Sequence, residues 1–211
     1  MAGNEFRTKR ILAKVYASQF LVDRDPMEYL QSSLEVDGAG LKIELKRARH
    51  EGLISYERNR PILAEKARKL IVVVMTGGGF DIIHPGHVET LERARALGDV
   101  LVVSVARNAT FERNKKRKPI HDETMRRRIV ASMRAVDAAV LGSETDIFET
   151  VQLIRPDIIA LGYDQAHSEK GIKTEVSRRG LNLKVVRLQS TVPEIKTSRI
   201  TETLNNSLTD T

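Results

Sequence analysis

The 211-residue sequence contains no cysteine, so the chain can form neither a disulfide framework nor a thiolate metal site. No apolar run approaches the roughly 18 residues of a membrane-spanning helix, and the N-terminus lacks the apolar core of a signal peptide. Internal repeats and low-complexity tracts are absent as well. These absences fit a reducing compartment, and we expect a soluble protein of the cytoplasm.

Apolar residues make up 41% of the chain, which is enough for one domain of ordinary size together with a small one. The net charge is +7, and it is spread along the chain. The first 69 residues hold 14 basic and 10 acidic side chains, and the remaining residues hold 21 and 18. Neither part is basic enough to imply nucleic acid by charge alone. A modest positive excess also suits an enzyme that binds polyphosphates.

The apolar pattern changes near residues 68–70. Before this point the spacing is helical, and after it the run from Leu70 to Met75 suits a strand that is buried on both faces. Predicted elements then alternate: helices over 85–97, 123–134, 147–154, 173–179 and 197–204, and strands over 100–105, 138–141, 157–161 and 183–188. This order predicts an α/β fold with a doubly wound parallel sheet, whose ligands bind at the carboxyl ends of the strands. We predict a small domain over 1–69, the α/β domain over 70–204 and a flexible tail over 205–211.

A glycine-rich segment, TGGGFDIIHPGH over residues 76–87, follows the first predicted strand. Its three consecutive glycines let backbone N–H groups approach an anion closely. Pro85 suits the first position of a helix, whose positive end would then face the strand tips, and Gly86 leaves room for a ligand. His84 and His87 can point at the same anion and stabilise charge that develops during transfer. The alternative is a glycine-rich turn with two surface histidines, and the position after a buried strand favours the phosphate site.

Residues 79–87, GFDIIHPGH, resemble the signature of the HIGH-type nucleotidyltransferase superfamily, in its cytidylyltransferase-like branch. The resemblance implies a Rossmann-like fold and a reaction without a covalent enzyme intermediate, in which an acceptor phosphate attacks the α-phosphorus of a nucleoside triphosphate. It implies that Gly79 and Phe80 hold phosphates through the backbone. It also implies that His84 and His87 bind the triphosphate and stabilise the transition state, so catalysis is positioning plus electrostatics.

Other segments match the family at expected places. Lys115, Arg117 and Lys118 lie in a basic cluster that resembles the family's lysine-rich loop, with Lys118 the catalytic candidate; a solvated loop is the alternative. Arg126 resembles a family arginine, although it could be a plain surface side chain. Asp164, after the fourth strand, resembles a nucleoside-binding residue, and otherwise is an aspartate in a turn. Thr197 and Ser198 resemble the closing motif of the triphosphate site, where the alternative is a simple helix N-cap.

Over about residues 70–204 the sequence resembles the archaeal FAD synthase family most closely. The agreement includes residues 79–87, 117–120, 126–127, 136–137, 141–143 and 156–165. The resemblance implies transfer of AMP from ATP to FMN, with a divalent cation such as Mg²⁺ carried by the triphosphate and no protein-bound metal. The residues themselves indicate only nucleotidyl transfer. Two alternatives therefore remain: a CTP-dependent cytidylyltransferase for glycerol 3-phosphate or a similar phosphorylated alcohol, and a DNA-binding regulator that responds to a flavin or a nucleotide.

The first seventy residues resemble a winged helix-turn-helix domain. Apolar spacing predicts two helices around a turn over 36–40, then a strand from Leu53 and a turn over 58–60. If the domain binds DNA, the second helix would enter the major groove. Its cations are Lys42, Lys46, Arg47 and Arg49, with Arg58 and Arg60 on the wing. Gly38 and Gly40 weaken the start of that helix, and Glu44 would repel DNA if it pointed outward, so the module could instead serve homodimer contacts or cover the substrate.

Overall fold

The computed structural model describes residues 2–163 and 168–190. Within these residues, every helix is too short or too polar to cross a membrane. The tail over 205–211 and the helix predicted over 197–204 lie outside the described residues.

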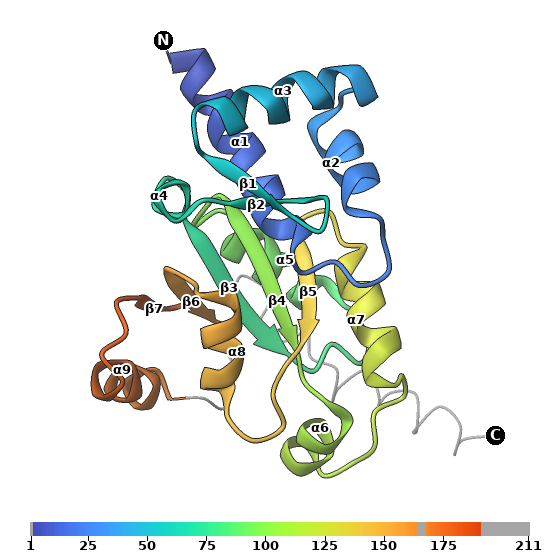
Figure 1. Ribbon diagram of the computed structural model, residues 1–211. Coiled ribbons are helices and arrows are strands. Elements are labelled where there is room, and N and C mark those ends of the chain that lie inside the picture. Colours follow the sequence, from blue (N-terminus) through green and yellow to red (C-terminus); the bar gives the residue numbers. More distant parts are fainter. Residues whose placement is uncertain (1, 164–167, 191–211) are drawn as a thin grey trace, which may run out of the picture.

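The N-terminal module consists of three helices followed by a β-hairpin, the element order of a winged helix-turn-helix (Figure 1). Its elements are α1 (Ala2–Ser18), α2 (Pro26–Leu34), α3 (Gly38–His50), β1 (Ile54–Glu57), β2 (Arg60–Leu63) and a short α4 (Glu65–Arg68). Strands β1 and β2 pair antiparallel around Arg58 and Asn59, which both have positive φ, as a tight two-residue hairpin turn requires. The structure corrects a boundary in this module, because α3 already begins at Gly38, inside the segment predicted to be a turn. It also corrects the start of the helix predicted over 173–179, which begins at Glu169.

The rest of the described chain forms a five-stranded sheet with helices between its strands. The strands are β3 (Val73–Gly78), β4 (Val100–Val105), β5 (Ala138–Leu141), β6 (Ile158–Leu161) and β7 (Lys184–Arg187). All neighbours pair parallel in the order β5-β4-β3-β6-β7, which confirms the predicted α/β doubly wound sheet. The helices are α5 (Pro85–Arg95), α6 (Asn108–Lys115), α7 (Glu123–Ala131), α8 (Ile147–Ile154) and α9 (Glu169–Arg178). Helix α6 was not predicted, because its segment is polar and only Phe111 is buried.

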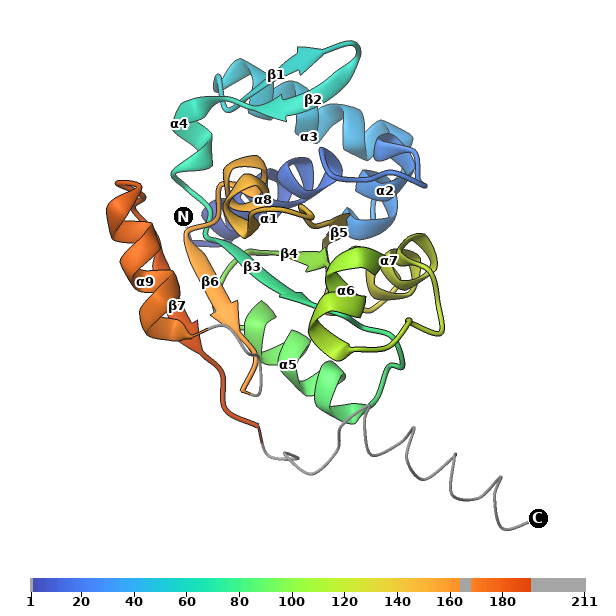
Figure 2. The same cartoon turned by 90° about the horizontal axis from the view of Figure 1, so that it is seen from below.

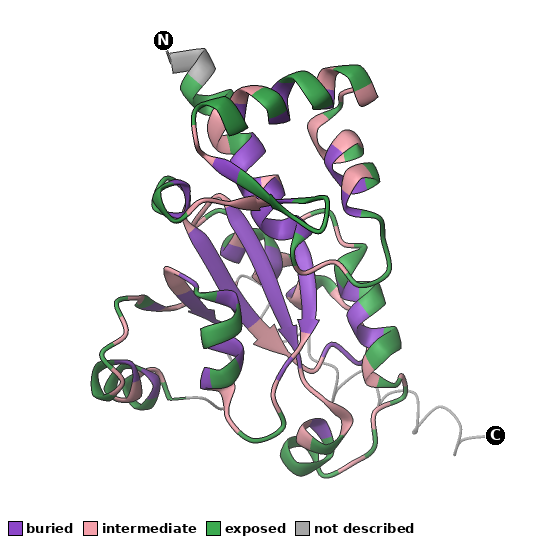
Figure 3. Ribbon diagram, in the orientation of Figure 1, coloured by how far each residue is buried: buried purple, intermediate pink, exposed green. Residues whose placement is uncertain are grey.

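Helices cover both faces of the sheet, and alternate residues of each strand supply the two cores. Val74 and Leu101 pack on the face of α5 and α7, whereas Val73 and Val100 pack on the face of α8. Figure 2 shows α5 on one side of the sheet, with α1 and α8 on the other. Strands β3, β4 and β5 are almost wholly buried (Figure 3), which explains their continuous apolar runs.

Helix α1 belongs to the core on the α8 face of the sheet, because its Leu12 and Val15 are fully buried in the same apolar cluster as Val73 and Val100. The Tyr16 hydroxyl donates to the Ile154 carbonyl at 2.5 Å, at the end of α8. Burial raises the pKa of Tyr16, and the Arg68 guanidinium nearby partly offsets this, so the phenol stays protonated and able to donate. The N-terminal module and the sheet therefore share one hydrophobic core.

Candidate active site

The glycine-rich loop begins where β3 ends, at the carboxyl edge of the sheet. Phe80 adopts a left-handed conformation, with φ of 52°, although its side chain is buried. Such a conformation costs a non-glycine residue on the order of 1 kcal/mol or more and is typical of functional loops. Gly79 cannot be replaced without movement, because a Cβ there would lie 2.7 Å from Cε2 of Phe111. The loop backbone therefore passes closely over α6, held in a conformation that the surrounding packing enforces.

Helix α5 starts directly after this loop, with His84 as its N-cap residue and Pro85 in its first turn. The rings of His84 and His87 stack, with centroids 3.9 Å apart, and Phe80 lies 5.2 Å from His87. The Nδ1 atoms of both histidines are buried. Gly86 is buried in the same turn. The predicted pair of histidines is thus brought together at the positive end of a helix, where an anion is favoured.

Asp81 connects the glycine-rich loop to the segment between α6 and α7, residues 116–122, which we call the basic loop. Its buried carboxylate accepts a hydrogen bond from Arg117 Nη1 at 2.7 Å and from the backbone N–H of Ile120 at 2.7 Å. The N–H of His121 also donates to Asp81, at 3.2 Å. Because one carboxylate holds a side chain and two backbone donors, Asp81 fixes the basic loop beside the loop that leads into the histidines.

Replacing Asp81 with asparagine tests this connection. Asparagine keeps one oxygen acceptor but loses the charge that Arg117 faces, so we expect the free energy of unfolding to fall by about 1–3 kcal/mol. The amides of Ile120 and His121 should also exchange their hydrogens faster. Urea unfolding and amide hydrogen exchange measure the two effects.

Asp99→Asn is the matched control, because Asp99 likewise accepts a backbone hydrogen bond, from Val72 N at 2.7 Å, on another part of the sheet. It should lower stability without changing exchange at Ile120 and His121. Unchanged exchange at these two amides in Asp81→Asn would show that Asp81 does not hold the basic loop.

Arg126 on α7 is fully buried and contacts backbone rather than solvent. Its Nη1 donates to the carbonyls of Gly79 at 2.6 Å and Ala106 at 2.8 Å, its Nε to the carbonyl of His121, and its Nη2 to Asn108 Oδ1. Burial lowers the pKa of Arg126, and the carboxylates of Asp81, Glu123 and Asp122 partly offset this shift. The geometry is that of a positioning residue, which holds the glycine-rich loop, the end of β4 and the basic loop in register.

Of the other predicted site residues, three lie in or near the basic loop and three lie outside the described residues. Arg117 lies in the network described above, whereas Lys115 and Lys118 are exposed near it, at the end of α6 and in the basic loop. Asp164, Thr197 and Ser198 lie outside the described residues.

Two residues of this cluster were not singled out from the sequence. Asp81 stands within the signature segment, and the available signal was its acidic charge among glycine and apolar residues. Phe111 is buried against Gly79, with the guanidinium groups of Arg117 and Arg126 at 5.1 and 5.3 Å from its ring centroid. Phe111 gave no signal, because helix α6 itself was not predicted.

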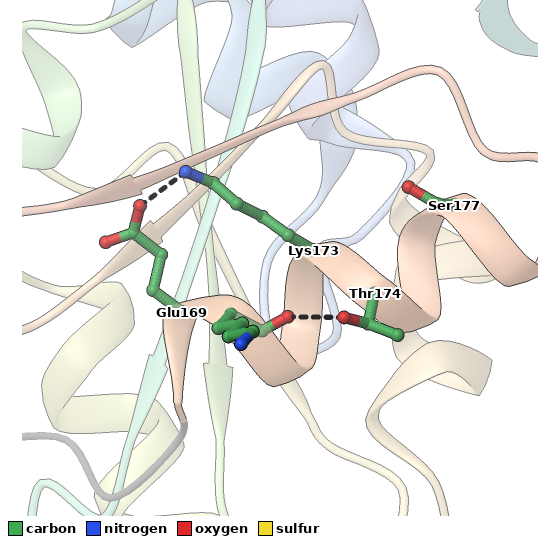
Figure 4. Close-up of a pocket in the computed structure, with 5 residues that line it drawn as sticks. Glu169, Lys173, Thr174 and Ser177 are labelled. Carbon is green, nitrogen blue, oxygen red and sulfur yellow. Dashed lines mark hydrogen bonds and ion pairs between the residues drawn. The ribbon is translucent and has the colours of Figure 1, made fainter.

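A shallow hollow elsewhere on the surface is lined by one helix, α9 (Figure 4). Lys173 Nζ donates to Glu169 Oε1 at 2.6 Å, and Thr174 Oγ1 donates to the Lys170 carbonyl at 2.9 Å. These polar groups pair with one another along a single helix, so the hollow has no arrangement of converging groups that would select a ligand.

Comparisons with known proteins agree with this geometry. Residues 75–203 match the family model described as cytidylyltransferase-like. A protein named FAD synthase from Aciduliprofundum boonei is 56% identical over 119 residues, which are 56% of this chain and 79% of that protein. Another FAD synthase, from Methanothrix thermoacetophila, is 51% identical over 127 residues, or 60% of this chain and 87% of its own.

A solved structure is similar as well. The crystal structure of the lipopolysaccharide core biosynthesis protein from Thermoplasma volcanium GSS1 has a TM-score of 0.55 and 42% sequence identity, over 57% of this chain and 98% of that one. The family match begins at residue 75, so the N-terminal module lies outside it.

Proposed function

Because this chain belongs to the cytidylyltransferase-like family and to its archaeal FAD synthases, we propose that the cluster around His84 and His87 catalyses the FAD synthase reaction. The enzyme is a nucleotidyltransferase that transfers AMP from ATP to FMN, which forms FAD and releases pyrophosphate. The roles of single residues in that reaction are our proposal.

The observation that supports this assignment best is the stacked histidine pair at the N-terminus of α5, directly after the strained glycine-rich loop. We assign the triphosphate to this point, with backbone N–H groups near Gly79 and Phe80 and the positive end of α5 facing its oxygens. Since both Nδ1 atoms are buried, the histidines would contact phosphate through Nε2. Donors held in place before the reaction stabilise charge without reorganising during it.

The chemical step is a direct displacement. An oxygen of the FMN phosphate forms a bond to the α-phosphorus of ATP, and the bond between that phosphorus and the bridging oxygen to the β-phosphorus breaks. The electron pair leaves with pyrophosphate, where negative charge accumulates. We assign its stabilisation to His84, His87 and the basic loop, with Lys118 as the mobile cation and Arg117 fixed by Asp81.

A divalent cation fits this scheme as part of the ATP complex. Among residues 2–163 and 168–190 there is no group of three or more His, Asp or Glu side chains that could hold a metal ion. Mg²⁺ commonly binds through substrate phosphates and one or two carboxylates, and keeps several waters. When bound, it would neutralise phosphate charge, while the protein's own cations and N–H groups orient the triphosphate. From the family resemblance we also propose that Asp164 contacts the nucleoside of ATP, and that Thr197 and Ser198 contact its triphosphate.

One assay tests the proposed reaction. The protein is incubated with Mg²⁺ and either ATP or CTP, against FMN or glycerol 3-phosphate, and pyrophosphate and FAD are measured. We expect FAD and pyrophosphate in equal amounts from ATP and FMN, and no FAD when EDTA removes the cation. Turnover of CTP with glycerol 3-phosphate and none of ATP with FMN would replace the proposed function with that of a cytidylyltransferase.

A further inference from the structure

The N-terminal module presents a basic surface that the AMP-transfer reaction does not use. It is formed by exposed cations of α3 and of the β1–β2 hairpin, which we call the α3–hairpin surface: Lys42, Lys46, Arg49, Arg58 and Arg60. Helix α3 lies at the opposite end of the molecule from the carboxyl ends of β3 and β4 (Figure 1). We propose that this surface binds duplex DNA, with α3 in the major groove and the hairpin against the backbone. This proposal does not depend on the proposed role of any active-site residue.

The three cations of α3 share one face of the helix. Lys42, Lys46 and Arg49 follow one another at four and three residues, and span about 10 Å along the helix axis. The neighbouring face, which carries Leu41, Glu44, Leu45 and Ala48, is buried in the core of the module. Packing therefore forces the cations outward, onto a helix that is narrow enough for the major groove of B-form DNA, about 12 Å wide.

The acidic residue of α3 does not interrupt this face. Glu44 is buried, with 5% of its surface exposed, and it forms ion pairs with Arg7 of α1 and with Arg47, the latter at 2.8 Å. Its charge is thus neutralised inside the module. A phosphate backbone on this surface would therefore meet no exposed carboxylate of α3.

The start of α3 is well formed in spite of its glycines. Asp37 is the N-cap residue, and its Oδ1 accepts a hydrogen bond from Gly40 N at 2.7 Å. A Cβ on Gly40 would lie 3.1 Å from that same oxygen and 3.3 Å from Cβ of Val36. The glycine therefore permits the close turn between α2 and α3 that directs α3 outward, as the turn of a helix-turn-helix does.

An apolar side chain stands among the cations. Ile43 is 68% exposed, three residues before Lys46 and therefore beside it on the surface of α3. Tyr56 on β1 is 40% exposed, and the Arg49 guanidinium lies 5.5 Å from its ring centroid. In a major groove, an isoleucine can contact the methyl group of thymine, and a tyrosine hydroxyl can donate to a phosphate. A free phosphate or a small polyphosphate would make no use of either group.

The hairpin extends the positive surface. Arg58 lies in the tight turn that it forms with Asn59, where both residues have positive φ, and Arg60 follows at the start of β2. Two exposed carboxylates, Glu51 and Glu57, lie in the same part of the chain, so the five cations remain in excess. Wing residues of this kind contact the sugar–phosphate backbone and add affinity without reading sequence.

The fit is to DNA rather than to double-stranded RNA. An A-form RNA helix has a deep and narrow major groove that a protein helix cannot enter. The order of three helices and a hairpin, with the third helix outward, places one helix for groove entry and one hairpin for the backbone.

Binding is tested with the full-length protein and a fluorescent DNA duplex of mixed sequence, about two helical turns long, by anisotropy at several salt concentrations. Because each neutralised phosphate releases counterions, five contacts should lower the affinity by about 10²- to 10³-fold between 50 and 200 mM salt. A dissociation constant weaker than about 10⁻⁴ M at the lowest salt would overturn the proposal, as would tighter binding to an RNA duplex of the same sequence.

The variant Lys42→Glu/Lys46→Glu/Arg49→Glu should weaken DNA binding at least about tenfold and reduce the salt slope by about three. Its control makes the same charge change at exposed cations outside the N-terminal module: Arg134→Glu/Lys170→Glu/Lys184→Glu. Equal losses in both variants would mean that affinity follows net charge alone, which overturns the proposal. FAD formation at the wild-type rate verifies that each variant is folded. If the first variant does not fold, Arg58→Glu/Arg60→Glu in the hairpin provides the same test, with an expected reduction of about two in the slope.

Discussion

Replacing His87 with alanine is expected to lower kcat for FAD formation by about 10²- to 10³-fold, with the protein still folded. His87 stands in the first turn of α5, stacked on His84 and close to Phe80. We propose that it donates to phosphate oxygens whose charge grows as pyrophosphate leaves. An interaction that strengthens in the transition state affects kcat and kcat/KM together, and steady-state kinetics with ATP and FMN measures both.

Two further variants separate chemistry from structure. His50→Ala removes an exposed histidine from another helix, α3, and should leave kcat unchanged. His87→Gln keeps an N–H donor on a side chain of similar reach, so its rate should lie between those of wild type and His87→Ala. A loss smaller than about tenfold in His87→Ala is what an ordinary hydrogen bond would give, and would remove His87 from the catalytic step.

Replacing Arg126 with methionine is expected to reduce both stability and activity. Methionine fills much of the same buried space but leaves the carbonyls of Gly79, Ala106 and His121 without the donors that Arg126 provides. We expect the free energy of unfolding to fall by about 3 kcal/mol or more, because buried acceptors lose charged donors. The kcat/KM of the folded fraction should fall by about 10²-fold, since small displacements of the glycine-rich loop misplace the triphosphate.

The adjacent residue supplies a matched control. Arg127 is also buried on α7, but its Nη2 pairs with Asp23 of the N-terminal module at 2.5 Å instead of with the active-site loops. Arg127→Met should lower stability and leave kcat/KM unchanged at a temperature where it is folded. A wild-type kcat/KM in folded Arg126→Met would show that Arg126 supports the fold alone and does not position the site.

Much of the active site is local in sequence and could therefore be predicted. Gly79, Phe80, His84 and His87 lie within nine residues, directly after an apolar run that is typical of a buried strand. Once the strand and helix are assigned, the chain geometry places both histidines at the strand tip. The parallel sheet was predictable for the same reason, because continuous apolar runs alternate with helical spacing.

The partners of the site residues could not be predicted, since they join distant parts of the chain. Asp81 meets Arg117 across 36 positions, and Arg126 reaches the Gly79 carbonyl across 47. The family resemblance implies that Arg126 binds the nucleotide, and a plain surface side chain is the alternative. Its complete burial against backbone carbonyls excludes the surface position and favours a positioning role, while the nucleotide contact stays a prediction.

The alternation of strands and helices, except for α6, could be read from the sequence, as could the location of the site at a strand tip and the type of reaction, because each depends on periodicity or on residues within one or two turns. The packing of α1 against the sheet, its hydrogen bond from Tyr16 to Ile154 of α8 across 138 positions, and the ion pair of Glu44 with Arg7 depend on the tertiary structure. A helical pattern fixes which residues share a face but not what the face meets. The burial of one face of α3 leaves its cations outside, and this depends on how the three N-terminal helices pack together.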